Sequence, residues 1–182
     1  MFGFTEDIKK YKQYSKKSSL VLVLTQQGLW ALWCYRVSNA IYKSALPGFI
    51  KKILLVFSVL HQKGIEITTG ISLPYSAQIG RAFYIGHFGN IIINANAIIG
   101  ANCNISQGVT IGVSGRGDKK GVPVIGDHVY MGVNAVIAGA ITIGDNAVIG
   151  ANSLVIHDVP SGTTVAGVPA KVINTNDSSP YI

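Results

Sequence analysis

The sequence is poor in charge and in cysteine. Only 13% of its 182 residues are Asp, Glu, Lys or Arg, whereas 48% are hydrophobic. A disordered chain needs the opposite balance, so this composition excludes one. The two cysteines are too few for a disulfide scaffold or for a cysteine-based zinc module. We therefore expect a folded protein with a real core and with both thiols reduced.

Membrane and export signals are also missing. The first residues, MFGFTEDIKK, lack the basic-then-apolar order of a secretory signal. No stretch offers the roughly 18 uninterrupted apolar residues that a spanning helix needs. We therefore expect a cytoplasmic protein.

Positive charge is concentrated in the first third of the chain. Residues 1–63 hold ten Lys or Arg and two acidic residues, a net charge of +8, whereas residues 64–182 have a net charge of −1. A nucleic-acid-binding domain would carry its basic and aromatic residues on its main folded body. The neutral body argues against nucleic acid as a partner.

A large aliphatic residue at every sixth position is the dominant pattern of the remaining chain. The three runs of this pattern are Ile67, Leu73, Ile79, Ile85; Ile93, Ile99, Ile105, Ile111; and Ile125, Met131, Ile137, Ile143, Ile149, Val155. In a short strand, residues i and i+2 point to one face, so a hexad with two inward side chains and a turn forms one side of a prism. Three hexads close one triangular coil, and stacked coils supply the core. An ordinary β-sandwich is disfavoured, because its strands do not repeat at a fixed spacing.

The hexad I-G-x-x-[AVC]-x resembles that of the hexapeptide-repeat acyltransferases. The resemblance covers residues 64–172, and the segment VAGVPAKV at 165–172 is similar to the family's closing G-x-P-A-[KR]-[VI] element. It implies a mostly β fold, a left-handed parallel β-helix, here of about five to six coils. The handedness comes from the resemblance, since parallel crossovers are nearly always right-handed. The resemblance also implies acetyl-CoA as co-substrate and a homotrimer with sites at the subunit interfaces.

The first interruption of the period carries a histidine, His87. The spacing from Ile85 to Ile93 is eight rather than six. An imidazole can take a proton near neutral pH, which suits a general base acting on a hydroxyl. The segment IGRAFYIGHFGNI at 79–91 resembles the serine acetyltransferase branch, whose I-G-x-G-x-x-x-D-H-x-x-G-I places the catalytic histidine here, and ISQGVTIG at 105–112 is also similar to that branch. The resemblance implies that His87 is the catalytic base.

Three positions depart from that branch. Gly86 stands where the branch has Asp before the histidine, Ser72 stands where an Asp orients the imidazole, and KGVP at 120–123 stands in place of D-R-H-P. An amino-acid substrate needs a carboxylate for its ammonium and a cation for its carboxylate. We therefore expect Ser72 or a backbone carbonyl to orient His87, and a sugar hydroxyl of surface polysaccharide biosynthesis (capsule, exopolysaccharide or O-antigen) as acceptor. The alternatives are serine O-acetylation for cysteine synthesis and a catalytically inactive scaffold.

The second interruption is a loop at residues 113–122, between Ile111 and Ile125. Its basic residues Arg116, Lys119 and Lys120 are predicted to contact the acceptor or the phosphates of coenzyme A; a solvated insertion is the alternative. By position in the family's last coils, the predicted cofactor-binding residues are Gly112, Gly132, Ala151, Ser153 and Lys171. No metal is expected, because the four histidines include no close pair.

The N-terminal third lacks the period of six and is predicted to be helical. Apolar residues recur at helical spacing within residues 19–44, Pro47-Gly48 breaks the chain, and residues 49–62 form a second predicted helix. The main interpretation is a helical hairpin packed on the β-helix or on a partner subunit. The alternative is peripheral attachment of residues 1–63 to the inner face of the membrane. The predicted organisation is a helical region at 1–63, the β-helix at 64–172 and a tail at 173–182.

Overall fold

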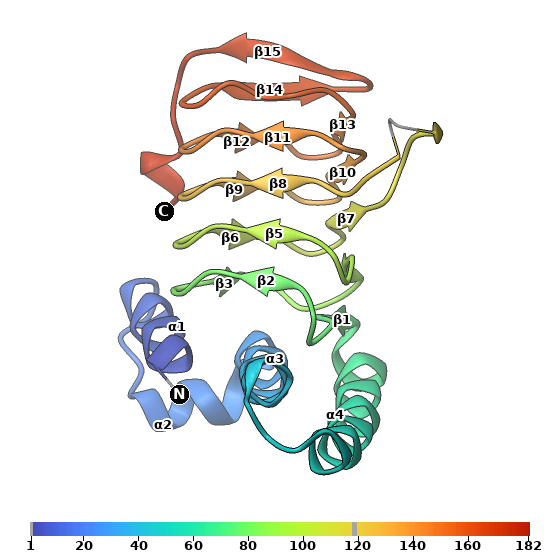
Figure 1. Cartoon of the computed structure of the whole chain (residues 1–182). Helices are drawn as coiled ribbons and strands as arrows, with labels where there is room; N and C mark the ends of the chain where they lie inside the picture. The colour runs from blue at the N-terminus through green and yellow to red at the C-terminus, as the bar shows by residue number, and fades with distance from the viewer. Residues whose placement is uncertain (1, 118–119) are drawn as a thin grey trace.

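Four helices come first in the structure and all the strands follow. A computed structural model describes residues 2–117 and 120–182, and Figure 1 shows the strands stacked above the helices. The helices are α1 (Phe2–Gln13), α2 (Ser19–Thr25), α3 (Gln27–Lys43) and α4 (Gly48–Thr69). The helical prediction for the N-terminal third is confirmed, with two differences: residues 19–44 are split at Gln26, and α1 precedes them.

The strands form three sheets in which every third strand pairs. Sheet A holds β1 (Ile71–Ser72), β4 (Ile91–Ile93), β7 (Thr110–Gly112), β10 (Val136–Ala138) and β13 (Leu154–Val155). Sheet B holds β2 (Gln78–Ile79), β5 (Ile98–Ile99), β8 (Val124–Ile125) and β11 (Thr142–Ile143). Sheet C holds β3 (Tyr84–Ile85), β6 (Asn104–Ile105), β9 (Tyr130–Met131), β12 (Val148–Ile149), β14 (Thr164–Gly167) and β15 (Ala170–Asn174). Pairing is parallel except between β14 and β15, so the predicted stack of triangular coils is confirmed.

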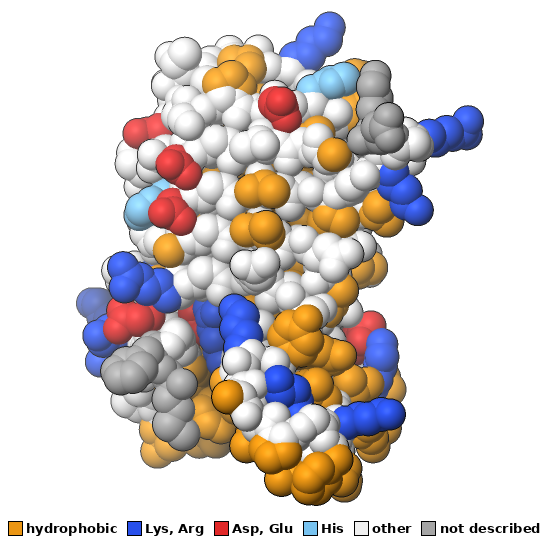
Figure 2. Space-filling view, in the orientation of Figure 1, with side chains coloured by type: hydrophobic (Ala, Val, Ile, Leu, Met, Phe, Trp, Pro, Cys, Tyr) orange, Lys and Arg blue, Asp and Glu red, His pale blue; other side chains and the backbone are white. Residues whose placement is uncertain are grey.

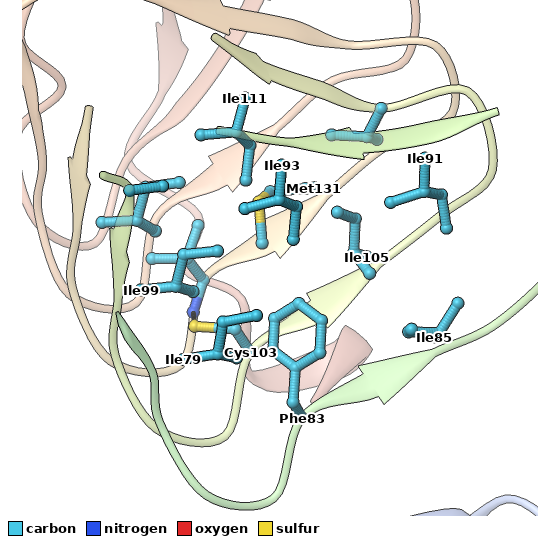
Figure 3. Packing of buried hydrophobic residues seen from close by; sticks show 14 of the residues in the cluster. Ile79, Phe83, Ile85, Ile91, Ile93, Ile99, Cys103, Ile105, Ile111 and Met131 are labelled. Atoms are coloured by element: carbon cyan, nitrogen blue, oxygen red, sulfur yellow. Dashed lines mark hydrogen bonds between the residues drawn. The ribbon is translucent and has the colours of Figure 1, made fainter. Parts of the chain in front are cut away.

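The inward hexad positions form the core. Ile85, Ile93, Ile105, Ile111 and Met131 are each at most 2% exposed, and Figure 3 shows such side chains filling the space between the three sheets. Burying a side chain of this size stabilises the fold by about 1.5–3 kcal/mol. The coils turn at corners where four asparagines (Asn102, Asn134, Asn146, Asn152) adopt positive φ of 56–59°. Asparagine tolerates this left-handed conformation better than most residues.

The β-helix begins later than the sequence pattern predicts. Ile67, predicted as the first inward position, lies on α4 and is 84% exposed. The helix ends only at Gly70, which adopts a φ of 67° that glycine reaches without strain. The first coil therefore starts at Ile71, and the predicted boundary after residue 63 falls inside α4.

Polar side chains of α1 and α3 cover the open edge of the first coil. The Tyr35 hydroxyl donates to the Ala77 carbonyl at 2.8 Å and accepts from the Ile79 N–H at 2.9 Å. The Tyr11 hydroxyl does the same for β3, donating to the Ile85 carbonyl at 2.9 Å and accepting from the Ile85 N–H at 3.2 Å. An uncovered strand edge would leave such groups unpaired. The helices therefore terminate the stack as well as pack against it.

One buried ion pair completes this cover. Arg36 donates to both carboxylate oxygens of Asp7 at 2.9 Å and to the carbonyls of Ile79 and Gly80 at 2.6 Å. The Phe83 N–H donates to Asp7 at 2.9 Å. Burial raises the pKa of the Asp7 carboxyl, and the Arg36 guanidinium opposes that rise. The pair thus joins α1 and α3 to the first coil.

The C-terminal residues return along sheet C toward the helices. The Ser178 N–H donates to the Asn146 carbonyl at 3.0 Å, and the Ser178 hydroxyl donates to the His128 carbonyl. Asn104 then donates to the carbonyl of Tyr181, the last residue of η2 (Ser179–Tyr181). The hydroxyl of Tyr14, the residue after α1, donates to the same carbonyl at 3.2 Å. Over residues 2–117 and 120–182, no helix is long and apolar enough to cross a membrane.

Candidate active site

His87 lies in the extended turn between β3 and β4, with an exposed side chain. The two extra residues of this turn push it out of the regular coil. A pocket of about 220 Å³ adjoins it. Its lining comes from the residue after α1, from three strands of sheet C with the turns that follow them, and from the tail: Tyr14, Tyr84, Gly86, His87, Asn104, Ile105, Ser106, Tyr130 and Tyr181. The base predicted from the sequence therefore borders a real cavity.

Two stacked pairs of tyrosines form the walls of this pocket. The rings of Tyr14 and Tyr84 lie 4.3 Å apart between centroids, and those of Tyr130 and Tyr181 lie 4.6 Å apart. Burial raises the pKa of Tyr84, so its hydroxyl stays protonated and uncharged at neutral pH. Sequence reasoning missed these residues, although Tyr84, Asn104 and Tyr130 occupy one register position of sheet C.

Three of the predicted cofactor-binding residues share a corner with His87. Gly132 and Ala151 lie in the turns from sheet C to sheet A, as His87 does, and Ser153 follows Ala151. A Cβ atom on Gly132 would lie 2.8 Å from the Ala151 nitrogen, so these turns are in close contact. The buried Ser153 hydroxyl accepts from the Gly167 N–H at 3.3 Å. One column of turns therefore carries the candidate base and these candidate cofactor contacts.

The other predicted site residues lie elsewhere in the chain. Ser72 is in β1 opposite Ile92, and its hydroxyl forms no hydrogen bond within the described residues. Arg116 and Lys120 are in the loop from sheet A to sheet B, whose ends are joined by the Ser114–Gly121 bridge. Lys119 is outside the described residues. Gly112 ends β7, and Lys171 is exposed on β15 at the far end of the stack. A single chain does not bring the loop residues to His87.

Both cysteines are buried and free of disulfide bonds. Burial raises the pKa of the Cys34 thiol, and it raises that of Cys103 to about 12, so both stay protonated thiols at neutral pH. Within residues 2–117 and 120–182, no group of three His, Cys, Asp or Glu side chains could hold a metal ion. His87 remains the only histidine of the tyrosine-lined pocket in the described part of the chain.

Comparison with known proteins decides the family. A profile of the bacterial transferase hexapeptide (six repeats) matches residues 123–157. The serine acetyltransferase of Bacillus licheniformis is 36% identical over 160 residues, covering 88% of this chain and 70% of the relative. The chain belongs to the hexapeptide-repeat acyltransferases. Its fold is their left-handed β-helix, and as a member it is an acetyl-CoA-dependent acyltransferase.

Solved structures agree with this assignment. The serine acetyltransferase of Neisseria gonorrhoeae has a TM-score of 0.82 at 30% identity, over 97% of this chain and 66% of that chain. The same enzyme in complex with serine has a TM-score of 0.79 at 31% identity, over 93% of this chain and 67% of that chain. A serine acetyltransferase in complex with CoA has a TM-score of 0.79 at 26% identity, over 93% of this chain and 68% of that chain. This acyltransferase spans about two thirds of those chains.

The predicted sugar acceptor is wrong. The relatives and solved structures are serine acetyltransferases, and none of those described above supports a role in polysaccharide biosynthesis. The prediction rested on Gly86, Ser72 and the segment at 120–123, which depart from the serine acetyltransferase pattern. The similarity to that branch nevertheless extends over 88% of the chain. The comparisons also give no support for the predicted contact of residues 1–63 with a membrane.

Proposed function

We propose that this acyltransferase transfers the acetyl group of acetyl-CoA to the hydroxyl of L-serine, the reaction by which its relatives are named. The observation that carries the proposal is His87 in the extended turn at the edge of a pocket, in a chain 36% identical to a serine acetyltransferase over 88% of its length. A general base at that place is what acetylation of a hydroxyl requires.

In the proposed mechanism, His87 takes the proton of the serine hydroxyl as the hydroxyl oxygen attacks the thioester carbonyl. The carbon–sulfur bond then breaks, the thiolate of coenzyme A leaves, and His87 returns the proton to that sulfur. The N–H of Gly112 from a neighbouring copy of the chain is the proposed donor to the oxyanion that forms in between. The protonation states of His87 at the start and the end are the same, so the cycle closes without another acid or base.

The proposed site is completed by a second copy of the chain. Hexapeptide-repeat acyltransferases are commonly trimers. Within one chain, the corner that carries His87 and the corner that carries Arg116 and Lys120 are separated by the width of sheet A. A homotrimer would place the loop of one copy against the His87 corner of the next. The guanidinium and ammonium groups would then be available to the phosphates of coenzyme A or to the serine carboxylate.

The ammonium of serine has no carboxylate among the described residues that line the His87 pocket. The nearest groups of suitable chemistry are the tyrosine ring faces and the Asn104 amide oxygen, which are weaker partners than a carboxylate. We therefore expect the KM of this acyltransferase for serine to be higher than that of a serine acetyltransferase with aspartate at the positions of Gly86 and Ser72.

An acceptor panel tests the proposal. Release of the coenzyme A thiol is measured with L-serine, D-serine, L-threonine and 3-hydroxypropionate, and the product is identified by mass spectrometry. We expect O-acetylserine and the highest rate with L-serine. A rate with L-serine no greater than the background hydrolysis of acetyl-CoA would overturn the proposal.

A further inference from the structure

We propose that Gln107 is a positioning residue that holds the imidazole of His87 through a hydrogen bond to its side-chain amide oxygen. The inference deepens the proposed function, since it rests on His87 as the base. This is the role predicted for Ser72, whose hydroxyl forms no hydrogen bond within the described residues. Gln107 differs from Ser72 in that its acceptor oxygen is buried and still lacks a partner among those residues.

The register of sheet C places Gln107 directly against the turn that carries His87. β3 pairs with β6 so that Ile85 lies opposite Ile105, and the Gly86 N–H donates to the Ile105 carbonyl at 3.0 Å. On the other side of the turn, the Gly108 N–H donates to the Gly89 carbonyl at 3.0 Å. Between these two hydrogen bonds, Gln107 is the residue of its coil that faces the segment with His87 and Phe88.

The side chain of Gln107 carries an unsatisfied polar atom. Its Oε1 is buried and has no hydrogen-bond partner among residues 2–117 and 120–182. A buried acceptor without a donor is destabilising by about 1–3 kcal/mol, and native proteins rarely tolerate one without a reason. A donor is therefore expected at this place in the working enzyme.

The neighbours of Gln107 leave few sources for that donor. In the coil above, the turn carries Val133 and Asn134. The Asn134 N–H is already used by the Gln107 backbone carbonyl at 3.0 Å, and the Asn134 side-chain Nδ2 donates to Asn152 at 3.3 Å. In the coil below, the turn carries His87 and Phe88, of which only the imidazole has a polar side chain. The geometry points to a ring N–H of His87 as the donor to Oε1.

Such a bond would fix which imidazole nitrogen carries the proton. An amide oxygen accepts only from the protonated ring nitrogen, so the other nitrogen keeps the lone pair that the base needs. A neutral amide differs from a carboxylate in one respect, because it selects the tautomer without adding a negative charge beside the imidazolium. Gln107 would therefore supply orientation alone.

Substitution of Gln107 separates orientation from charge. Gln107→Met keeps the size of the side chain and removes the acceptor, whereas Gln107→Glu keeps an acceptor and adds a charge. Gln78→Met, on exposed β2 of sheet B, is the matched control. We expect Gln107→Met to lower kcat by about tenfold to a hundredfold, the range found for partners that orient a ligating histidine, with the KM for acetyl-CoA and the melting temperature unchanged.

Gln107→Glu should rescue most of kcat and move the acidic limb of the kcat/KM profile to higher pH, because a carboxylate favours the imidazolium. The other ionisable groups near this pocket are Tyr14, Tyr84, Tyr130 and Tyr181, with Lys10 lying 5.8 Å from the Tyr14 ring centroid. None of these is altered by the two substitutions, so the profile shift reports on position 107.

A second readout needs no acceptor and keeps this inference separate from the proposed function. The chain is labelled with ¹⁵N-histidine, and the ring-nitrogen signals of His87 are recorded for the free wild type and for Gln107→Met. We expect one tautomer in the wild type and a mixture in the variant. The same tautomer populations in both proteins would overturn the role of Gln107. Absence of serine acetylation by the wild type would instead overturn the proposed function, and the spectra would still decide this one.

Discussion

The β-helix and α4 bury their apolar residues to very different extents. In the coils, the inward side chains are almost fully buried because each coil covers the next. In α4, by contrast, only Thr69 is buried, and Phe49, Phe57 and Ile67 are 70%, 66% and 84% exposed. Figure 2 shows apolar side chains gathered over the helical end, with Lys and Arg around them. The coils bury their apolar side chains against one another, whereas most apolar side chains of α4 stay on the surface of the single chain.

Polar groups of the helices add to the apolar packing of buried residues such as Leu29 and Leu32 on the first coil. The first coil has a regular apolar interior but an open edge of backbone N–H and carbonyl groups. Tyr11, Tyr35 and Arg36 satisfy those groups. Stacking holds the coils together, whereas apolar packing and hydrogen bonding to the open edge both hold the helices to the coils.

The largest expected effect tests the difference in burial. Phe83 is fully buried in the first coil, whereas Leu60 on α4 is 64% exposed. Phe83→Ala should lower the free energy of unfolding by about 3–5 kcal/mol, and Leu60→Ala should change it by no more than about 0.5 kcal/mol. Urea unfolding followed by circular dichroism measures both. A loss for Leu60→Ala as large as that for Phe83→Ala would mean that α4 is covered by another subunit.

Removal of Arg36 tests the polar attachment. Arg36→Met leaves the Asp7 carboxylate buried without its partner, which should lower the free energy of unfolding by about 3–5 kcal/mol at neutral pH. Burial already raises the pKa of Asp7, and the loss of Arg36 raises it further. A folded-state pKa above the unfolded one makes stability fall as pH rises, so the deficit should be smaller near pH 5 than near pH 8. A deficit that does not vary with pH would show that Asp7 is not the group left unpaired.

A smaller effect is expected for Tyr11. Tyr11→Phe keeps the ring and removes the hydroxyl that bonds both the N–H and the carbonyl of Ile85. The loss should be about 1–3 kcal/mol, because two buried backbone groups lose their partner. Tyr14→Phe is the control, since its hydroxyl bonds the exposed tail and Asn104 rather than the edge of the first coil. Equal losses for the two variants would argue against the edge as the main attachment.

The sequence predicted the coils well because their pattern is local. Every hexad has an inward position that holds an aliphatic residue, so the period alone predicts that Ile85, Ile105 and Met131 lie in the core. A break in the period likewise marks the turn that carries His87. The pattern failed at Ile67, where isoleucine at the right spacing occurs inside a helix that continues to Thr69.

The tyrosine-lined pocket could not be predicted in the same way. Tyr14 and Tyr181 come from opposite ends of the chain and meet only because α1 and the tail both pack on sheet C. Such contacts leave no periodic trace in the sequence. The acceptor prediction was wrong because it rested on a few positions and not on the similarity of the whole chain. The unpartnered side-chain oxygen of Gln107 could not be predicted either, because its burial depends on how the side chains pack.

The most direct test of the account compares His87 with another histidine at a turn. The rate of thiol release from acetyl-CoA with L-serine is measured for the wild type, His87→Asn and His128→Asn. His128 has a φ of 57°, a conformation that asparagine also tolerates, so its substitution is a matched control. The account predicts a fall of about 10²- to 10⁴-fold for His87→Asn and no change for His128→Asn. A wild-type rate in His87→Asn would contradict it.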